Sequence, residues 1–266
     1  MPKKILRKFI RRFGYDFVKT PHTVPEHTYR RKSNLPGADY FETPTGNYYL
    51  PKQTQKDFVA MAVKRGEVFD KPVMDIISAA VQPGTSILDV GANYGQMSVL
   101  LSKLHDGSCT VYSFEAQKMV YDILEKNLAA NQCRNVKAYY NAVYDRNGET
   151  LIFPEPDLVR FSSYGSYGID PTGSSGIPVT SITIDSIDFS KPVSFMKVDI
   201  QGSDIFALRG AEQTIRKYRM PIIFEYEEGF QEEFGTSFQD YVDFVNHIGY
   251  KFVKTIQEIN YLIIPK

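Results

Sequence analysis

The stretch LDVGANYGQ, residues 88–96, decides the fold of this 266-residue chain. A short apolar run contains Asp89 near its end, and Gly91 and Gly95 follow before a helical pattern begins. Glycine lets the backbone approach a ligand closely, and a helix N-terminus offers free N–H donors. On its own the pattern also fits a plain tight turn. It predicts a strand, a turn and a helix, with the turn facing a ligand.

The rest of the chain alternates short apolar strands with helical stretches. We expect strands over residues 86–92, 110–116, 136–145, 194–200, 221–228, 251–256 and 260–266, and helices over 95–104, 119–131, 205–218 and 238–249. Such alternation produces right-handed βαβ units and a mostly parallel sheet. The last two strands form a hairpin, which requires at least one antiparallel strand. The sequence therefore predicts an α/β fold.

We expect these elements to form one domain over residues 52–266. Residues 21–51 are rich in Pro, Thr, Asn and Gly and are predicted to be a connecting arm, so residues 1–51 are set apart. Residues 146–192 interrupt the alternation with many Gly, Ser, Pro and Tyr. Because this insertion lies between the third and fourth expected strands of the sheet, we place it on the substrate side, where loops meet at the carboxyl ends of the strands.

The basic residues are concentrated near the start of the chain, although the whole chain has 31 basic and 31 acidic residues. Residues 1–32 hold ten Lys or Arg and two acids, with apolar residues at helical spacing between them. A basic amphipathic helix can bind an anionic membrane or a polyanionic glycan. The simpler alternative is a capping helix whose apolar side docks on the domain. No basic stripe continues beyond it, so we expect no nucleic-acid binding.

The composition, 42% hydrophobic and 23% charged, is typical of a soluble globular protein. No apolar run approaches the ~20 residues needed to span a bilayer, and the N-terminus lacks the apolar core of a secretory signal. The two cysteines are far apart and no two His or Cys have ligand spacing, so we predict neither a disulfide framework nor a zinc site. We expect a cytoplasmic protein, peripheral to the membrane if the basic helix binds lipid.

The second expected strand ends in FEA, which places Glu115 and Ala116 at its carboxyl end. In Rossmann-type sites an acid at this place accepts hydrogen bonds from ribose hydroxyls. A dinucleotide fingerprint has G-x-G-x-x-G, whereas here Asn93 stands where the central Gly would be. Asp89 would repel a pyrophosphate but suits a cationic ammonium. Asp89, Gly91 and Glu115 together therefore predict S-adenosylmethionine (SAM) as the cofactor.

The third expected strand completes the predicted SAM site. Ala142 and Val143 would flank the adenine plane, and Asn141 would donate a hydrogen bond to it. A nicotinamide-binding oxidoreductase is the rival interpretation, against which Asp89 and Asn93 both argue. The predicted cofactor-binding residues are Asp89, Gly91, Asn93, Gly95, Glu115, Ala116, Asn141 and Ala142.

Six segments in a fixed order carry a resemblance to a known family: ILDVGANYGQMSVLLSK, VYSFEAQ, NAVYD, TSITIDSI, FMKVDIQGSDIFALRGAEQTI and PIIFEYEE. Over residues 68–264 the chain resembles the FkbM family of SAM-dependent methyltransferases. This resemblance implies a class I methyltransferase Rossmann-like fold: a seven-stranded, mostly parallel sheet with helices on both faces and the last strand inserted antiparallel. It also implies O-methylation of a hydroxyl on a sugar, a glycan or a natural product.

Two charged residues, Lys197 and Asp199, lie at the end of the apolar strand FMKVDI. A period of two places both on the same side of the strand, so they can pair. A sugar hydroxyl is a poor nucleophile that a base or a metal ion would help, although no metal is predicted. We expect Asp199 to face the acceptor hydroxyl or the SAM amino group, with Lys197 orienting the substrate or holding Asp199 ionised. The alternative is a pair that only closes the strand end.

Four further residues are predicted to contact the acceptor. After the catalytic Asp, the FkbM family commonly has Val-Glu-Gly, where this chain has Ile-Gln-Gly with Gln201 in the middle. Gln201 keeps the size and hydrogen bonding of the family Glu but loses its charge. Glu225 lies in the next strand of the class I order. Tyr164 and Tyr167 of the insertion can stack on a sugar ring, or else are aromatic residues of a mobile loop.

These features together predict an enzyme that transfers a methyl group from SAM to a hydroxyl of a small-molecule or glycan acceptor, with a sugar of a glycan or glycoconjugate as the first choice. A natural-product acceptor, a Rossmann-type oxidoreductase and a non-catalytic scaffold are the alternatives. No feature of the sequence indicates an oligomeric state.

Overall fold

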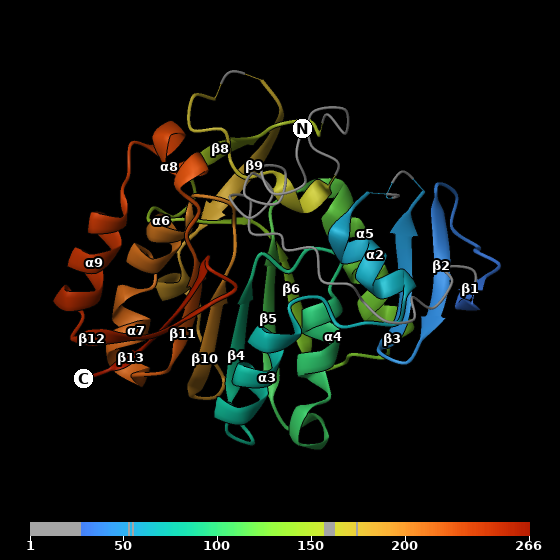
Figure 1. Cartoon of the computed structure of the whole chain (residues 1–266), viewed down its shortest axis with the longest axis horizontal. Coiled ribbons are helices and arrows are strands. Elements are labelled where there is room, and N and C mark those ends of the chain that lie inside the picture. Colours follow the sequence, from blue (N-terminus) through green and yellow to red (C-terminus); the bar gives the residue numbers. More distant parts are fainter. Residues whose placement is uncertain (1–27, 53, 55, 157–162, 174) are drawn as a thin grey trace, which may run out of the picture.

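The computed structural model describes residues 28–52, 54, 56–156, 163–173 and 175–266. Most of the predicted basic segment, residues 1–27, lies outside these ranges, as do residues 157–162 of the insertion. Within the described ranges, no helix is both long and apolar enough to cross a bilayer. Figure 1 shows a central sheet covered by helices on both faces, with a small sheet to one side.

Seven strands within the described ranges build the central sheet: β4 (Ser86–Val90), β5 (Thr110–Glu115), β6 (Val136–Tyr140), β10 (Val193–Val198), β11 (Ile222–Glu225), β12 (Tyr250–Ile256) and β13 (Asn260–Pro265). Their order is β12-β13-β11-β10-β4-β5-β6. β13 is antiparallel to both of its neighbours, whereas the pairs from β11 to β6 are parallel. The predicted mostly parallel sheet with the last strand inserted antiparallel is confirmed.

The path of the chain across this sheet reverses between β4 and β10. From β4 the chain adds β5 and β6 on one side, whereas β10 and β11 follow on the other. In open α/β sheets, ligands bind at such a switch point, outside the carboxyl ends of the strands. Gly91 lies there with a φ of +84°, and a Cβ atom on it would come within 1.9 Å of the Asp199 carbonyl oxygen. Only glycine fits between these two strand ends.

Eight α-helices are assigned within the described ranges: α2 (Phe58–Lys64), α3 (Lys71–Ala80), α4 (Gln96–Ser102), α5 (Lys118–Ala130), α6 (Asp204–Arg209), α7 (Glu212–Tyr218), α8 (Glu228–Phe234) and α9 (Phe238–His247). α3, α4 and α5 pack on one face of the sheet, and α6, α7 and α9 pack on the other. Strand side chains alternate between the two cores, with Ile87 toward α3 and Leu88 toward α7.

The structure differs from the sequence-based expectation at three elements. The expected helix 205–218 is broken into α6 and α7, because Gly210 approaches another segment so closely that a Cβ would lie 2.0 Å from the Tyr144 carbonyl oxygen. The expected strand 136–145 divides after β6, and its second part, β7 (Ala142–Val143), pairs outside the central sheet. α8 was not predicted, since Gly229 in its first turn weakens the helical signal.

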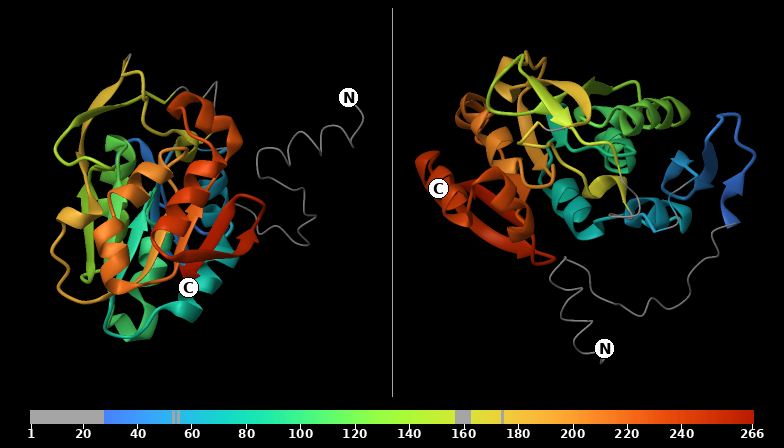
Figure 2. Two further views of the ribbon diagram at one scale, coloured as in Figure 1. Left: turned by 90° about the vertical axis from the view of Figure 1, so that its left-hand side faces the viewer. Right: turned by 90° about the horizontal axis from the view of Figure 1, so that it is seen from above.

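The described part of the predicted connecting arm forms a small antiparallel sheet instead. It consists of β1 (Arg30–Arg31), β2 (Ala38–Thr43) and β3 (Gly46–Pro51). Asn127 of α5 and Asn131, which caps the end of this helix, tie β3 to the domain: the backbone N–H groups of Asn47 and Tyr49 donate to Asn131 and Asn127 at 2.9 and 2.6 Å. Figures 1 and 2 show this sheet beside α2 and α5. The Pro- and Gly-rich composition hid the strand alternation.

The insertion between β7 and β10 lies over the carboxyl ends of the parallel strands (Figures 1 and 2). It contains β8 (Thr150–Phe153), β9 (Ile177–Ile182) and the short 3-10 helices η3 (Tyr164–Ser166) and η4 (Ile184–Ser186). β7, β9 and β8 form a three-stranded sheet in that order. A Cβ on Gly168 would lie 2.6 Å from the Gln201 carbonyl oxygen, so the insertion touches the turn after β10.

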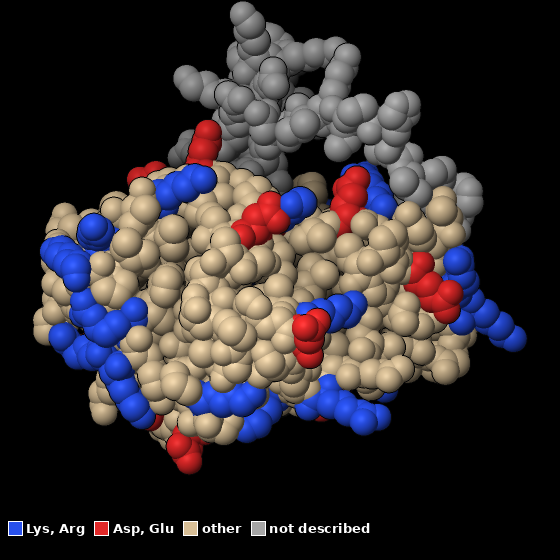
Figure 3. Space-filling model, turned by 90° about the horizontal axis from the view of Figure 1, so that it is seen from below, with Lys and Arg blue, Asp and Glu red and all other residues tan. Residues whose placement is uncertain are grey.

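Figure 3 shows the lower face, where Lys and Arg gather at the left, toward the side of α7 and β12, while Asp and Glu are scattered over the rest of the face. Basic and acidic side chains pair on α7: Arg216 and His247 both approach Glu212, at 2.8 and 3.0 Å. Burial raises the pKa of Glu212, but the hydrogen bonds and charges of these two partners outweigh it and lower the pKa overall. Glu212 is therefore paired with basic partners on this part of the surface.

Candidate active site

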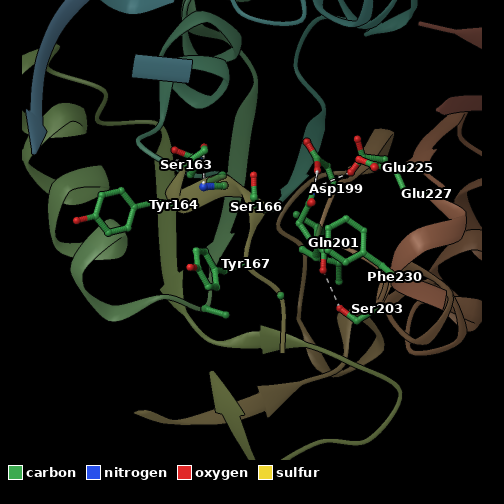
Figure 4. A pocket seen from close by; sticks show the side chains of 18 of the residues that line it. Ser163, Tyr164, Ser166, Tyr167, Asp199, Gln201, Ser203, Glu225, Glu227 and Phe230 are labelled. Carbon is green, nitrogen blue, oxygen red and sulfur yellow. Dashed lines mark hydrogen bonds between the residues drawn. The ribbon is translucent and has the colours of Figure 1, made fainter. Parts of the chain in front are cut away.

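A cavity of about 1130 Å³ lies at the carboxyl ends of β4, β5, β10 and β11. Its lining includes the glycine loop after β4, the end of β5, insertion residues 163–169 and α8. Figure 4 shows residues of the insertion on one side and residues that follow β10 and β11 on the other. Of the predicted site residues, all except Asp89 and Gly95 line this cavity.

The glycine loop is shaped by hydrogen bonds of Asn93. This residue has a φ of 51°, a left-handed conformation that asparagine adopts more readily than most residues. Its side-chain oxygen accepts from the Tyr94 N–H at 2.6 Å. Asn93 therefore takes the place of a central Gly without losing the turn. Gly95 packs elsewhere: a Cβ on it would lie 2.4 Å from Leu124 Cδ1 of α5, so it serves helix packing rather than the cavity wall.

Glu115 is held in the cavity wall by the backbone. Its two carboxylate oxygens accept from the N–H groups of Asn93 at 2.9 Å and Gln117 at 2.8 Å. Burial raises the pKa of Glu115 to about 7, even though these hydrogen bonds act in the opposite direction. The carboxyl group is thus fixed in direction without a cation beside it, and it can accept hydrogen bonds from a neutral hydroxyl.

Asp89 lies beneath the cavity, on the α4 side of the sheet. It is fully buried, and Ser98 Oγ donates to its Oδ2 at 2.6 Å. Its Oδ1 has no hydrogen bond within the described residues. Burial raises the pKa of Asp89, although Lys197 opposes this. Because Asp89 does not line the cavity, the structure offers no direct contact between it and a ligand there, and its role toward the SAM ammonium stays a prediction.

The residues expected around adenine lie together. Ala116, Asn141 and Ala142 all line the cavity beside Glu115. The Asn141 amide donates to the Thr180 carbonyl at 3.0 Å, which uses one of its two N–H groups and links it to the insertion. The other N–H and the amide oxygen form no hydrogen bond with the described residues, so a heterocycle can bind them.

The opposite end of the cavity holds the Lys197–Asp199 pair. Lys197 Nζ lies 3.0 Å from Asp199 Oδ2, with side-chain exposures of 6% and 23%. Burial alone would raise the pKa of Asp199, but the charge of Lys197 outweighs it and lowers this pKa. Burial likewise opposes the charge of Lys197, whose pKa is raised by Asp199 and Asp89. Both side chains are therefore held ionised.

Gln201 bridges two carboxyl groups in this end of the cavity (Figure 4). Its amide nitrogen donates to Asp199 Oδ1 at 3.2 Å and to Glu225 Oε2 at 2.7 Å. Burial and the neighbouring Asp199 raise the pKa of Glu225 well above its usual range. A Glu in place of Gln201 would bring a third carboxyl group against these two. The amide instead links them without added charge.

Two site residues were missed by the sequence analysis. Glu227 follows β11, lines the cavity near Asp199, and has its pKa raised to about 7 by burial and by that charge. Asp57 caps α2 and is fully buried. It accepts from the Ala60 N–H, the Tyr94 hydroxyl, the Ser163 hydroxyl and the Tyr164 N–H. Its only sequence signal is that of a helix cap.

Asp57 thereby joins α2, the glycine loop and the insertion through one carboxylate. The insertion side of the cavity depends on it, since Tyr164 also lies edge-on to Tyr94 with ring centroids 6.4 Å apart. Tyr164 and Tyr167 both line the cavity. Within the described residues, no group of three or more His, Cys, Asp or Glu is arranged to hold a metal ion.

The family model for the methyltransferase FkbM domain matches residues 89–252, more than half of the chain. The chain belongs to the FkbM methyltransferase family. The family resemblance seen in the sequence is thus confirmed, and with it a SAM-dependent methyltransferase domain. The matched range contains the glycine loop, the insertion and the Asp199 end of the cavity, so both ends of the site belong to the FkbM domain.

Solved structures with a similar fold include an FkbM methyltransferase from Methylobacillus flagellatus KT, with 14% identity, a TM-score of 0.46, and coverage of 77% of this chain and 52% of that chain. This chain thus spans about half the length of that protein. A TehB-like SAM-dependent methyltransferase from Corynebacterium glutamicum is similar at 13% identity, a TM-score of 0.44, and 77% and 92% coverage. No curated protein matches the chain. The family assignment rests on the family model.

The residues of this FkbM domain fit SAM. Gly91 leaves open the space that a Cβ would fill at the switch point, and the Glu115 carboxyl group lines the wall beside it. The volume of about 1130 Å³ lies above the upper end of the range common for small-molecule sites, roughly 300–1,000 Å³, so the cavity has room for a cofactor together with an acceptor.

Proposed function

We propose that the chain transfers a methyl group from SAM to a hydroxyl group, on a sugar of a glycan or glycoconjugate. One observation carries this proposal: a single cavity joins the glycine loop and Glu115 at one end to Asp199 and Glu225 at the other. A cofactor at the first end and a hydroxyl at the second can therefore meet inside one space. Methyl transfer needs little from a protein beyond such positioning.

The cofactor end would hold SAM through its backbone and Glu115. The loop Gly91–Asn93 approaches the amino-acid part of SAM, Glu115 accepts from the ribose hydroxyls, and Ala116, Asn141 and Ala142 surround the adenine. SAM supplies the methyl group on a sulfonium, which is already a good leaving group. The catalytic unit in this proposal is residues 52–266, with the 146–192 insertion on the acceptor side.

Asp199 would orient the acceptor hydroxyl. Lys197 keeps Asp199 ionised, so its carboxylate accepts a hydrogen bond from the hydroxyl and directs the oxygen lone pair toward the methyl group. A carboxylate with a lowered pKa is a weak proton acceptor. Glu227, whose pKa is raised to about 7, is better matched to take the hydroxyl proton as the oxygen–carbon bond forms.

Aromatic side chains favour a sugar as the acceptor. Tyr164 and Tyr167 from the insertion line one side of the cavity, and Phe230 from α8 lines the opposite side, next to Gln201. The apolar faces of sugar rings pack on aromatic rings, while their hydroxyls need polar partners such as Gln201 and Asp199. This combination supports a carbohydrate over a purely apolar natural product.

Two measurements test the proposal. Calorimetry with SAM and with NAD should show that the protein binds SAM but not NAD. A glycan panel incubated with methyl-labelled SAM should show the label incorporated into a glycan as a methyl ether. Binding of NAD in place of SAM would favour the oxidoreductase alternative. SAM binding without methylation of any glycan, but with methylation of an amine or a carbon acid, would refute the hydroxyl assignment.

A further inference from the structure

Five carboxylates surround the acceptor end of the cavity, and we call them the acidic rim: Asp70, Glu228, Glu232, Glu233 and Glu258. They come from three separate segments, namely the start of α3, α8 and the turn between β12 and β13. The four glutamates are exposed and Asp70 is half-buried. Three distant parts of the chain thus bring negative charge to one opening.

The acidic rim has no ion-pair partner within the described residues, although the charge of Lys197 acts on Asp70. None of its five carboxylates forms an ion pair there, in contrast to Glu212 on α7, which has two basic partners. Among the described residues that line the cavity, Lys197 is the sole Lys or Arg, and Asp199 already pairs with it. A cavity lined by one sign of charge concentrates the opposite sign in the ligand that enters it.

Asn260 gives a second and independent indication of a polar ligand. It is only 4% exposed and lines the cavity, opposite Glu225 in the pairing of β11 with β13. Its side-chain amide makes no hydrogen bond to any described residue. Because its amide atoms are not among the buried side-chain atoms without a partner, a ligand or water in the cavity can complete their hydrogen bonds. Asn260 offers both an acceptor oxygen and donor N–H groups.

We propose that the acceptor carries a protonated amine near the hydroxyl that is methylated, as an amino sugar with a free amino group does. This inference rests on the proposed function and specifies its substrate class. The ammonium would donate to the Asn260 oxygen and lie within the field of the acidic rim, and the Phe230 ring offers it an aromatic face. Phosphorylated or uronate acceptors would be repelled by the same carboxylates.

The positive charge of SAM does not account for the acidic rim. The proposed SAM residues, Gly91 and Glu115, follow β4 and β5. The rim residues of α8 and of the β12–β13 turn follow β11 and β12, on the other side of the switch point. Glu115 therefore supplies negative charge at the cofactor end of the cavity, and the acidic rim supplies it at the acceptor end.

The test is calorimetry on the full chain saturated with S-adenosylhomocysteine, whose own binding is measured first. Three trisaccharides of equal size are then titrated: glucosamine, N-acetylglucosamine and galacturonate trimers. We expect the glucosamine trimer to bind about fivefold or more tightly than its N-acetyl counterpart, with the galacturonate trimer weakest, and added salt to reduce this preference.

A matched pair of double variants locates the effect. Glu232→Gln with Glu233→Gln removes two rim charges and should reduce the preference for the amine about two- to tenfold. Asp106→Asn with Glu125→Gln removes two exposed carboxylates away from the cavity and should leave it unchanged. Three outcomes would overturn the inference. The N-acetyl trimer could bind as tightly as the glucosamine trimer or more tightly, all three trimers could fail to bind, or the preference for the amine could persist in the rim variant. Failure to bind S-adenosylhomocysteine would instead refute the proposed function.

Discussion

The two ends of the cavity hold their carboxyl groups in opposite ways. At the β4–β5 end, backbone N–H groups of Asn93 and Gln117 fix Glu115, and burial raises its pKa to about 7. At the β10–β11 end, Lys197 pairs with Asp199, and its charge lowers the pKa of that carboxyl group in spite of burial. The first end is held by uncharged partners and the second by a charged side chain.

This difference shows what each end can do. Uncharged amides fix the direction of a carboxyl group but leave it readily protonated, whereas an adjacent ammonium keeps a carboxylate ionised even when it is buried. The first arrangement suits a neutral ribose that needs only a hydrogen-bond acceptor. The second suits a hydroxyl that must be oriented and must lose its proton. Four substitutions would break or sharpen this comparison.

Gly91→Ala should have the largest effect, because Gly91 lies where the two ends meet. The new Cβ would collide with the Asp199 carbonyl at a φ of +84°, so we expect stability to fall by about 3 kcal/mol and cofactor binding to be lost. Urea denaturation and calorimetry with S-adenosylhomocysteine measure the two effects. Gly84→Ala is the matched control, with a φ of +72° and open space around it, and should cost only about 1 kcal/mol.

Asp199→Asn should affect catalysis more than cofactor binding. The Asn amide oxygen is a weaker, uncharged acceptor for the hydroxyl, so we expect kcat to fall about 10²- to 10³-fold while the affinity for S-adenosylhomocysteine changes less than about threefold. Steady-state kinetics and calorimetry separate these effects. Asp75→Asn, which removes an exposed partner of Lys71, should change neither. Full turnover in the Asp199 variant would show that the ion pair only closes the strand end.

Glu115→Gln should weaken SAM binding about tenfold above neutral pH, where the native carboxylate is ionised and accepts the ribose hydrogen bonds most strongly. In the native protein, SAM affinity should rise with pH through about 7, following the raised pKa of Glu115. The variant should lack this rise. Calorimetry across the pH range measures both, and identical pH dependence of the two proteins would exclude the ribose role.

The same group makes a prediction for stability. Its pKa is raised in the folded state from 4.5 to about 7, so between these values the unfolded chain loses a proton that the folded chain keeps. Unfolding is then favoured more as pH rises through this window, and the contribution of Glu115 becomes constant above it. Urea denaturation should show a smaller decline in stability with pH for Glu115→Gln than for the native protein.

Gln201→Glu should have the smallest effect. It restores the family residue and adds a third carboxyl group beside Asp199 and Glu225, which raises the pKa values of the group. We expect the acidic limb of the pH–rate profile to move up by roughly one unit and stability to fall by about 1 kcal/mol. Gln213→Glu, on the exposed surface of α7, is the control. An unchanged profile would mean that Gln201 does not set the charge of this end.

The sequence by itself determined most of the central sheet and predicted the residues around the glycine loop. The glycine loop, the following helix and Glu115 are close in the chain, and their pattern follows from local backbone needs: left-handed φ values, a free helix N-terminus and a strand end. The alternation of strands and helices likewise predicted a parallel sheet, because a helix between two strands forms a right-handed connection that brings them side by side in parallel. Asp89 shows the limit, since its motif position did not reveal that it faces α4 beneath the cavity.

Beyond the Lys197–Asp199 pair, which the spacing in the strand predicts, only the tertiary structure decided which groups meet across the cavity. Asp57 joins three segments, Gln201 bridges β10 to β11, and the acidic rim gathers residues from α3, α8 and the β12–β13 turn. These contacts join segments that are far apart in the sequence, so no periodicity or spacing of residues predicts them. The pKa values of Glu225 and Glu227 depend on burial and on Asp199, which exist only once the chain is folded. The sequence predicted which cofactor to expect, and the packing of the folded chain decided which carboxyl groups line the rest of the cavity and what their pKa values are.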